Sequence, residues 1–224
     1  MEPSPPPLLY GLDIETDTAV GGLDPRISRI IAAAVSTPGR DVVLTGPEPE
    51  LLADLDELVW GLPAGVLVTW NGASFDLPFL ADRARRCGAT LGLTIDPDPR
   101  LPTRTPLPGH EGSYRGRWYW HRHLDAYRVY RNDLKRLLDV SCSLKSVAQL
   151  LGLPTTSVDA ARVHELGHGE LVAYVASDAR LAQAAALARW STAVPFVDPD
   201  PHPDPNPQAR KPRSVQHQLL PSIP

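Results

Sequence analysis

The stretch that decides the fold is Leu8-Leu9-Tyr10-Gly11-Leu12-Asp13-Ile14-Glu15-Thr16, an apolar run that ends in two carboxylates one residue apart. Side chains alternate between the two faces of a strand, so Asp13 and Glu15 project from the same side. Two buried like charges are costly to hold together unless a cation compensates them. The pair therefore indicates a cation site, and a solvated strand end running into a turn is the alternative.

The composition is typical of a soluble globular protein with one well-cored domain and a tail. The chain has 224 residues, of which 42% are hydrophobic and 21% charged. No apolar run approaches the roughly 20 residues of a membrane span, and the amino terminus lacks the features of a signal peptide. Cys87 and Cys142 form neither a metal-binding spacing nor a disulfide framework. We therefore predict a cytoplasmic protein without a membrane partner.

The order of apolar patterns predicts an α/β domain over residues 8–190, with a mixed central sheet and helices on both faces. Residues 1–7 are expected to form an extended lead-in, and the proline-rich residues 191–224 a disordered tail. Residues 92–116, rich in proline and glycine, are expected to be an irregular insertion. The first three expected strands, 8–16, 27–36 and 41–44, form an antiparallel meander, followed by a strand at 65–70 and another at 118–125. Helices are expected at 49–60, from Asp76 to about 87, and at 126–138, 143–152 and 170–189.

Two further motifs carry acids that can reach the same point as Asp13. Asn71-Gly72 is a strong turn signal, and it places Asp76 at or near the start of a helix, where an acid ordinarily caps the helix. Tyr174 and Asp178 are four residues apart on the last expected helix, so they share a face. Taken alone, they would be a half-buried aromatic and a surface acid. A strand, a helix start and a helix face can nevertheless converge on one site.

The set Asp13-x-Glu15, Asn71-Gly-x-x-Phe-Asp76 and Tyr174-x-x-x-Asp178 resembles the three motifs of the DEDD superfamily of 3′-5′ exonucleases, which adopt a ribonuclease H-like fold. Within it, the chain is most similar to the proofreading domains of family B DNA polymerases and their stand-alone bacterial relatives. Residues 123–128 and 143–152 also resemble the segment between the second and third motifs. A tyrosine stands four positions before the last acid, and Ala173 occupies the position where the other branch has histidine. The chain therefore resembles the tyrosine branch, DEDDy.

This resemblance implies a site for two Mg²⁺ or Mn²⁺ ions. Asp13, Glu15 and Asp178 would bind the first ion, Asp13 would bridge to the second, and Asp76 would act directly or through water. Hard cations prefer carboxylate oxygens, so an all-acid set suits them. Two such ions can activate the attacking water and hold the leaving 3′ oxygen. Tyr174 would orient that water, because an ordinary tyrosine, with a pKa of about 10, is a poor base at neutral pH.

Substrate contacts are less sharply defined by the sequence. The resemblance places Thr16, Asn71 and Phe75 beside the terminal nucleotide, although Phe75 also suits an ordinary core position. The stretch from Arg100 to Arg131 has seven arginines among aromatic residues and two acids, which fits single-strand contact or a half-buried strand. Within it, Asp125 suits either a helix cap or a fifth acid near the metals, with the cap favoured. Lys145 contacts either a phosphate or nothing.

These features predict a metal-dependent 3′-5′ exonuclease that releases nucleoside monophosphates from single-stranded or frayed ends, with DNA favoured. The alternatives are a 3′-5′ exoribonuclease and a non-catalytic nucleic-acid-binding module on the same fold. The net charge of −4 argues against a protein that coats nucleic acid through a general positive field. The expected partners are nucleic-acid 3′ ends and a polymerase or DNA repair protein in trans, because no polymerase follows within the chain.

Overall fold

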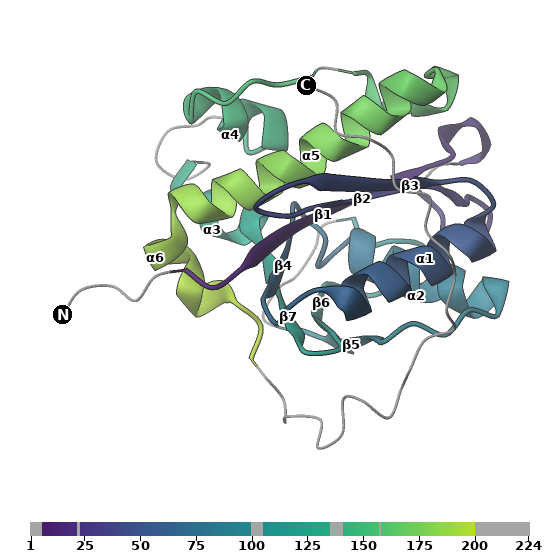
Figure 1. Cartoon of the computed structure of the whole chain (residues 1–224), viewed down its shortest axis with the longest axis horizontal. Helices are drawn as coiled ribbons and strands as arrows, with labels where there is room; N and C mark the ends of the chain where they lie inside the picture. Colours follow the sequence, from purple (N-terminus) through teal and green to yellow (C-terminus); the bar gives the residue numbers. More distant parts are fainter. Residues whose placement is uncertain (1–5, 22, 100–104, 135–140, 157, 200–224) are drawn as a thin grey trace.

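The opening motif forms strand β1 (Leu9–Thr16), which lies inside a seven-stranded sheet of order β3-β2-β1-β4-β7-β6-β5 (Figure 1). The computed structural model describes residues 6–21, 23–99, 105–134, 141–156 and 158–199. The other strands are β2 (Ile30–Ser36), β3 (Asp41–Thr45), β4 (Val66–Thr69), β5 (Leu93–Pro97), β6 (Tyr114–Trp118) and β7 (His121–Asp125). The α-helices are α1 (Glu48–Gly61), α2 (Asp76–Cys87), α3 (Ala126–Asp133), α4 (Leu144–Leu150), α5 (His168–Ala188) and α6 (Trp190–Ala193). Short 3₁₀ helices are η1 (Thr18–Val20), η3 (Ala160–Glu165) and η4 (Val194–Phe196).

The sheet is mixed, as predicted. Strand β1 pairs antiparallel with β2 and parallel with β4, and β4 pairs parallel with β7. The pairs β2–β3, β5–β6 and β6–β7 are antiparallel. The predicted meander of the first three strands is therefore confirmed. The two parallel pairs bring the carboxyl ends of β1, β4 and β7 to one edge of the sheet, where the acidic motifs begin.

Alternation along β1 divides its side chains between the two helical layers. Tyr10, Leu12 and Ile14 enter a core with Leu51 of α1 and Phe79 of α2. The residues between them face α5, which crosses the other side of the sheet (Figure 1). The predicted fold class, an α/β domain with helices on both faces of a mixed sheet, is confirmed. None of the helices in the described ranges has the length and hydropathy needed to cross a membrane.

Local signals account for the ends of the two helices on the first face. Helix α1 begins after Pro47 and has Glu48 and Glu50 in its first turn, where carboxylates complement the helix dipole. Helix α2 ends at Gly88, whose φ of 66° is a left-handed conformation that glycine adopts without strain. Arg83 of α2 donates to Glu48 at 2.8 Å, and this ion pair joins the two helices.

Two expectations for the middle of the chain were wrong. The described part of 92–116 is not irregular throughout, because β5 pairs with β6 from Leu93 opposite Trp118 to Pro97 opposite Tyr114. The single strand expected over 118–125 is instead a hairpin of β6 and β7, since Trp118 pairs with His121. Tyr119 between them has a φ of 55°, and its hydroxyl donates to Asp56. That backbone reversal breaks a pattern whose alternation looked continuous.

The prediction of disorder from residue 191 was wrong for residues 191–199. Residues 191–199 include the end of α6 and all of η4, and Asp198 is only 3% exposed. Ala193 is fully buried against the core formed by α3 and α5. The remaining tail residues, 200–224, lie outside the described residues, as do residues 1–5 of the lead-in. Proline content was a poor guide for residues 191–199, because buried contacts hold them against the domain.

Candidate metal centre

Three carboxylates from two elements meet at the carboxyl end of β1. Asp13 and Glu15 come from β1 and Asp178 from α5, and each offers an oxygen within 4.8 Å of the others. Asp178 is buried, and the two acids on β1 are partly buried. The shared strand face predicted from residue alternation is what brings Asp13 and Glu15 to α5 together.

Gly11 explains how α5 comes close enough to β1. A Cβ atom added at Gly11 would lie 1.8 Å from the main-chain oxygen of Ala179, well inside van der Waals contact. Ala179 also packs with Ala32 and Ala34 of β2, so small residues line the contact at this position. Because Asp178 is next to Ala179, this close approach carries it to the acids of β1.

We expect Gly11→Ala to destabilise the protein by about 1–3 kcal/mol, the usual cost of overpacking a filled interior. The clash is with backbone rather than a flexible side chain, so α5 must move away from β1. Urea denaturation measures the loss. Gly169→Ala is a matched control, because Gly169 lies on the exposed first turn of α5 and an added Cβ meets no atom within 4 Å. Equal stability of Gly11→Ala and the native protein would contradict this account.

Asp76 stands beside the three acids without belonging to their group. It is the first residue of α2, and Phe75 precedes it as the cap without a side-chain hydrogen bond, so Asp76 does not occupy the capping position that an acid ordinarily takes there. Its carboxylate instead accepts from its own backbone N–H and from that of Ile14, between the two acids of β1. The turn before α2 and the strand β1 are thus tied together at this carboxylate.

The electrostatics of the group show a strong excess of negative charge. Burial raises the pKa of Asp13 well above its usual value, and the charges of Glu15, Asp76 and Asp178 raise it further. Burial, followed by the charges of Asp178 and Asp76, raises the pKa of Glu15 to about 8. The pKa of Asp76 rises to about 7, mainly through burial, although two backbone hydrogen bonds oppose this. Burial also raises the pKa of Asp178.

Lys145 and Tyr174 complete the charge balance around Asp178. The Lys145 ammonium forms an ion pair with Asp178 and lies 4.8 Å from the centre of the Tyr174 ring. The hydroxyl of Tyr174 donates to Asp178, and burial followed by the nearby carboxylates raises the pKa of Tyr174. Sequence reasoning left the role of Lys145 open. Ser143 caps α4, so the sequence places Lys145 in the first turn of that helix. Its pairing with Asp178 could be predicted only with the knowledge that α4 packs on α5.

The residues present fit divalent cations of the Mg²⁺ or Mn²⁺ type. Their donor atoms are all carboxylate oxygens, which such ions prefer. Asp13 Oδ2 is buried and has no hydrogen-bond partner in the described part of the chain. A buried carboxylate oxygen without a donor is costly, and a cation would satisfy it. The unpaired oxygen and the raised pKa values both indicate a site built for positive charge.

The structure places the predicted substrate contacts around the same end of the sheet. Asn71 is exposed at the turn after β4, with a φ of 67°, and its N–H donates to Asp125 Oδ1 at 2.8 Å. Phe75 is half-buried against Phe79, with ring centroids 5.3 Å apart. Thr16 is 4% exposed. Contact of Thr16, Asn71 and Phe75 with a nucleotide stays a prediction.

Three aromatic or histidine side chains of the basic and aromatic stretch lie in the domain interior. Trp118, His121 and His123 on β6 and β7 are at most 1% exposed, which supports a half-buried strand at these positions rather than a single-strand surface. Asp125 caps α3 by accepting from the N–H of Tyr127, as favoured. Residues 100–104 lie outside the described part.

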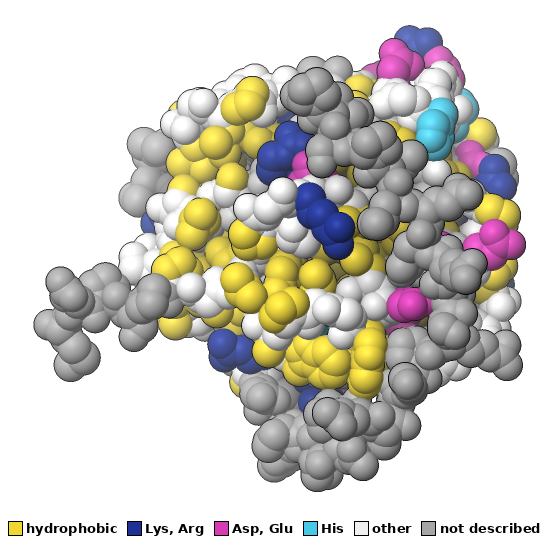
Figure 2. All heavy atoms as spheres, in the orientation of Figure 1, with side chains coloured by type: hydrophobic (Ala, Val, Ile, Leu, Met, Phe, Trp, Pro, Cys, Tyr) yellow, Lys and Arg dark blue, Asp and Glu magenta, His cyan; other side chains and the backbone are white. Residues whose placement is uncertain are grey.

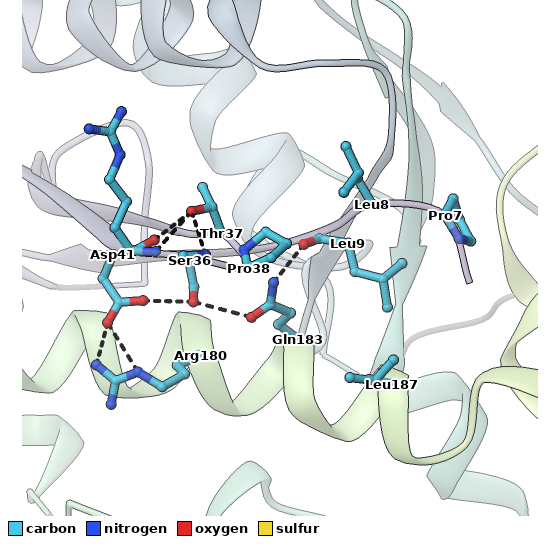
Figure 3. A pocket seen from close by; sticks show the side chains of 12 residues that line it. Pro7, Leu8, Leu9, Ser36, Thr37, Pro38, Asp41, Arg180, Gln183 and Leu187 are labelled. Carbon is cyan, nitrogen blue, oxygen red and sulfur yellow. Dashed lines mark hydrogen bonds and ion pairs between the residues drawn. The ribbon is translucent and has the colours of Figure 1, made fainter. Parts of the chain in front are cut away.

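A pocket of about 540 Å³ lies at the opposite end of β1 and contains none of the clustered acids. Figure 3 shows Gln183 reaching the main-chain oxygen of Leu9, and Arg180 paired with Asp41. Figure 2 shows hydrophobic side chains gathered on the centre of the viewed face. Two leucines that line the pocket, Leu8 and Leu187, are 43% and 54% exposed. Its polar groups bind one another, so the pocket does not share the chemistry of the acidic centre.

Comparisons with known proteins agree with this architecture. Among solved structures, the family B DNA polymerase from the hyperthermophilic archaeon Pyrobaculum calidifontis is similar, with 19% sequence identity and a TM-score of 0.63. The similarity covers 85% of this chain but only 25% of the polymerase chain, and at this identity it concerns the fold alone. A search of curated proteins found no match. A family model described as RNase_H superfamily matches residues 11–166, well over half of the sequence, and the chain therefore belongs to that superfamily.

Proposed function

We propose that this protein is a metal-dependent 3′-5′ exonuclease that hydrolyses phosphodiester bonds at single-stranded or frayed 3′ ends, with DNA favoured. The observation that carries the proposal is the meeting of Asp13, Glu15 and Asp178 within 4.8 Å, with the Tyr174 hydroxyl bonded to Asp178. Membership of the RNase_H superfamily supports a nuclease, and the resemblance of the three sequence motifs to proofreading domains of DNA polymerases favours DNA.

In this proposal Asp13, Glu15, Asp76 and Asp178 hold a pair of Mg²⁺ or Mn²⁺ ions. When bound, such ions neutralise phosphate charge, lower the pKa of the attacking water and stabilise the leaving 3′ oxygen. The carboxylates lie close together in a site largely buried from water. Because burial and mutual repulsion disfavour their negative charges, a bound cation is strongly stabilised there. The close contact at Gly11 holds α5 against β1, and the Ile14 N–H holds the Asp76 carboxylate next to β1.

Tyr174 acts by orientation rather than as a base. Its raised pKa keeps the phenol protonated at neutral pH, so it donates a hydrogen bond and cannot remove a proton. Its hydroxyl is held by Asp178, one helical turn further along α5. This is the placement expected of a tyrosine that orients the attacking water, as in the tyrosine branch that the sequence resembles. Lys145 offsets the negative charge around Asp178.

The substrate is proposed to approach over the turn between β4 and α2. Asn71 is exposed there, and Phe75 is only partly covered by Phe79. With Thr16 at the end of β1, these residues are the proposed contacts of the terminal nucleotide. Cooperation with a polymerase or a repair protein in trans, and a cytoplasmic location, belong to the same proposal.

The test uses 5′-labelled DNA and RNA strands of one sequence, incubated with the purified protein and Mg²⁺ or Mn²⁺. We expect progressive shortening of DNA from its 3′ end with release of nucleoside monophosphates, and no reaction with a chelator. A circular single strand is the control, because it has no end. Faster loss of RNA would favour an exoribonuclease, and cleavage of the circle would indicate an endonuclease. Binding without shortening under either metal would favour a non-catalytic module.

A further inference from the structure

The segment that follows α5 returns to the sheet and forms hydrogen bonds with it. The backbone N–H of Asp198 donates to the main-chain oxygen of His123 on β7 at 2.7 Å, and its carboxylate accepts from the N–H of Gly116 on β6 at 2.9 Å. Asp198 is therefore tied to two neighbouring strands. It lies outside the residues matched by the family model, which end at 166.

The carboxylate of Asp198 also bonds two side chains. Its Oδ2 lies 3.1 Å from His123 Nδ1, and its Oδ1 lies 3.4 Å from Arg128 Nη1 on α3. The ring of Phe196, two residues earlier, lies 5.8 Å from the guanidinium carbon of Arg128. Arg128 thus supplies the positive charge that a buried carboxylate needs.

The contacts of His123 determine which of its nitrogens carries the proton. A carboxylate only accepts hydrogen bonds, so Asp198 places the proton on Nδ1. In a neutral ring Nε2 is then an acceptor, and the Thr69 hydroxyl, 2.8 Å away, donates to it. Asp198, His123 and Thr69 resemble an Asp-His-hydroxyl catalytic triad. With exposures of 3%, 1% and 0% they cannot reach a substrate, which excludes a nucleophilic role.

The hydroxyl of Thr69 lies directly beneath the turn that leads to Asp76. A Cβ atom added at Gly72 would lie 2.2 Å from Thr69 Oγ1, so the turn rests on this side chain. The N–H of Leu77 donates to the main-chain oxygen of Gly72 at 3.0 Å, which continues the turn into α2. A change in the position of the Thr69 side chain, which the hydrogen bond to His123 holds, would therefore move the start of α2.

We propose that Asp198 is a positioning residue for the acidic centre: it fixes the tautomer of His123 and, through Thr69, the turn that carries Asn71 and Asp76. The proposal rests on the proposed function for its kinetic consequence, whereas the tautomer and the turn geometry concern the free protein. In this proposal the segment after α5 helps to position the acidic centre.

The variant Asp198→Asn tests this directly. Asparagine has nearly the same shape, but its amide can donate to His123 Nδ1 and so stabilise the other tautomer. Asp96→Asn is the matched control, because Asp96 is exposed on the edge strand β5. Nitrogen NMR of the imidazole is expected to show a single Nδ1–H form of His123 in the native protein and in the control. In Asp198→Asn we expect the Nε2–H form to be populated, with shifted amide signals from residues 71–77.

Kinetics on a single-stranded oligonucleotide complete the test. We expect kcat to fall about 10- to 100-fold in Asp198→Asn, as is usual when a residue that orients a site is lost, and to stay unchanged in the control. A native His123 that is doubly protonated or carries its proton on Nε2 would overturn the proposal. So would lowered stability with unchanged kcat and unchanged amide signals of the turn. If Asp198→Asn does not fold, Thr69→Val, which replaces the hydroxyl with a methyl group of similar size, must shift the amide signals of the turn. Absence of cleavage by the native protein would refute the proposed function and leave the NMR result decisive for the turn.

Discussion

We expect the Asp13→Asn variant to lose metal-dependent cleavage of 3′-ended oligonucleotides, by at least about 10²-fold, as when one electrostatic stabiliser of a transition state is removed. The charges of Glu15 and Asp178 both act on the Asp13 carboxylate. Its buried Oδ2 has no hydrogen-bond partner among the described residues. Asparagine replaces that oxygen or its partner with an amide nitrogen that repels a cation. The initial rate of shortening of a 5′-labelled strand measures the loss.

The same variant should be more stable than the native protein without metal. Burial and three like-charged neighbours oppose ionisation of Asp13, so removing its charge removes an unfavourable term from the folded state. Thermal unfolding in a chelator measures this gain, and Mn²⁺ titration calorimetry measures the accompanying loss of metal affinity. Asp96→Asn, an exposed change of the same kind, should alter neither quantity. If Asp13→Asn kept more than a tenth of the native activity, the proposed role of Asp13 in metal-dependent cleavage would be wrong.

Much of the fold and of the arrangement of the acids follows from local rules. Alternation along β1 predicted the shared face of Asp13 and Glu15, and helical spacing predicted the shared face of Tyr174 and Asp178. These rules succeed here because β1 and α5 are regular over the residues concerned, so the periodicities of 2 and 3.6 residues hold. The catalytic and substrate-binding roles of these residues remain predictions.

What the sequence did not reveal depends on contacts between distant residues. Lys145 pairs with an acid 33 residues away, and nothing in its neighbours indicates that partner. Gly11 looked like one more small residue, although its missing side chain sets the distance between β1 and α5. Asp198 lies in an Asp-Pro alternation that favours disorder, yet it bonds to Gly116, His123 and Arg128. A composition average cannot detect one residue whose burial is favourable.

The second large effect is the dependence of stability on pH and metal. In the metal-free folded protein the pKa of Glu15 is raised from 4.5 to about 8 and that of Asp76 from 3.8 to about 7, and the pKa of Asp13 is also raised. The folded state therefore binds more protons than the unfolded state between these values, so the free energy of unfolding falls as pH rises. His121 acts in the opposite direction, because burial lowers its pKa from 6.5 to about 4, but its contribution is complete above 6.5. Above about pH 6.5 the acids therefore act without this opposing contribution, so the window for the measurement is from about pH 6.5 to 8.

In a chelator we expect the melting temperature to fall by about 3–5 °C per pH unit across this window for one titrating group, since one proton corresponds to about 1.4 kcal/mol per pH unit. Mg²⁺ or Mn²⁺ at a hundredfold excess over its dissociation constant should raise the melting temperature by about 5–10 °C. The metal should stabilise more at higher pH, because it binds the deprotonated carboxylates. Differential scanning calorimetry at a series of pH values measures both effects, and Asp13→Asn should give a shallower slope than native or Asp96→Asn. A metal-free protein that becomes more stable between about pH 6.5 and 8 would contradict the buried, mutually repelling acids on which the proposed centre rests.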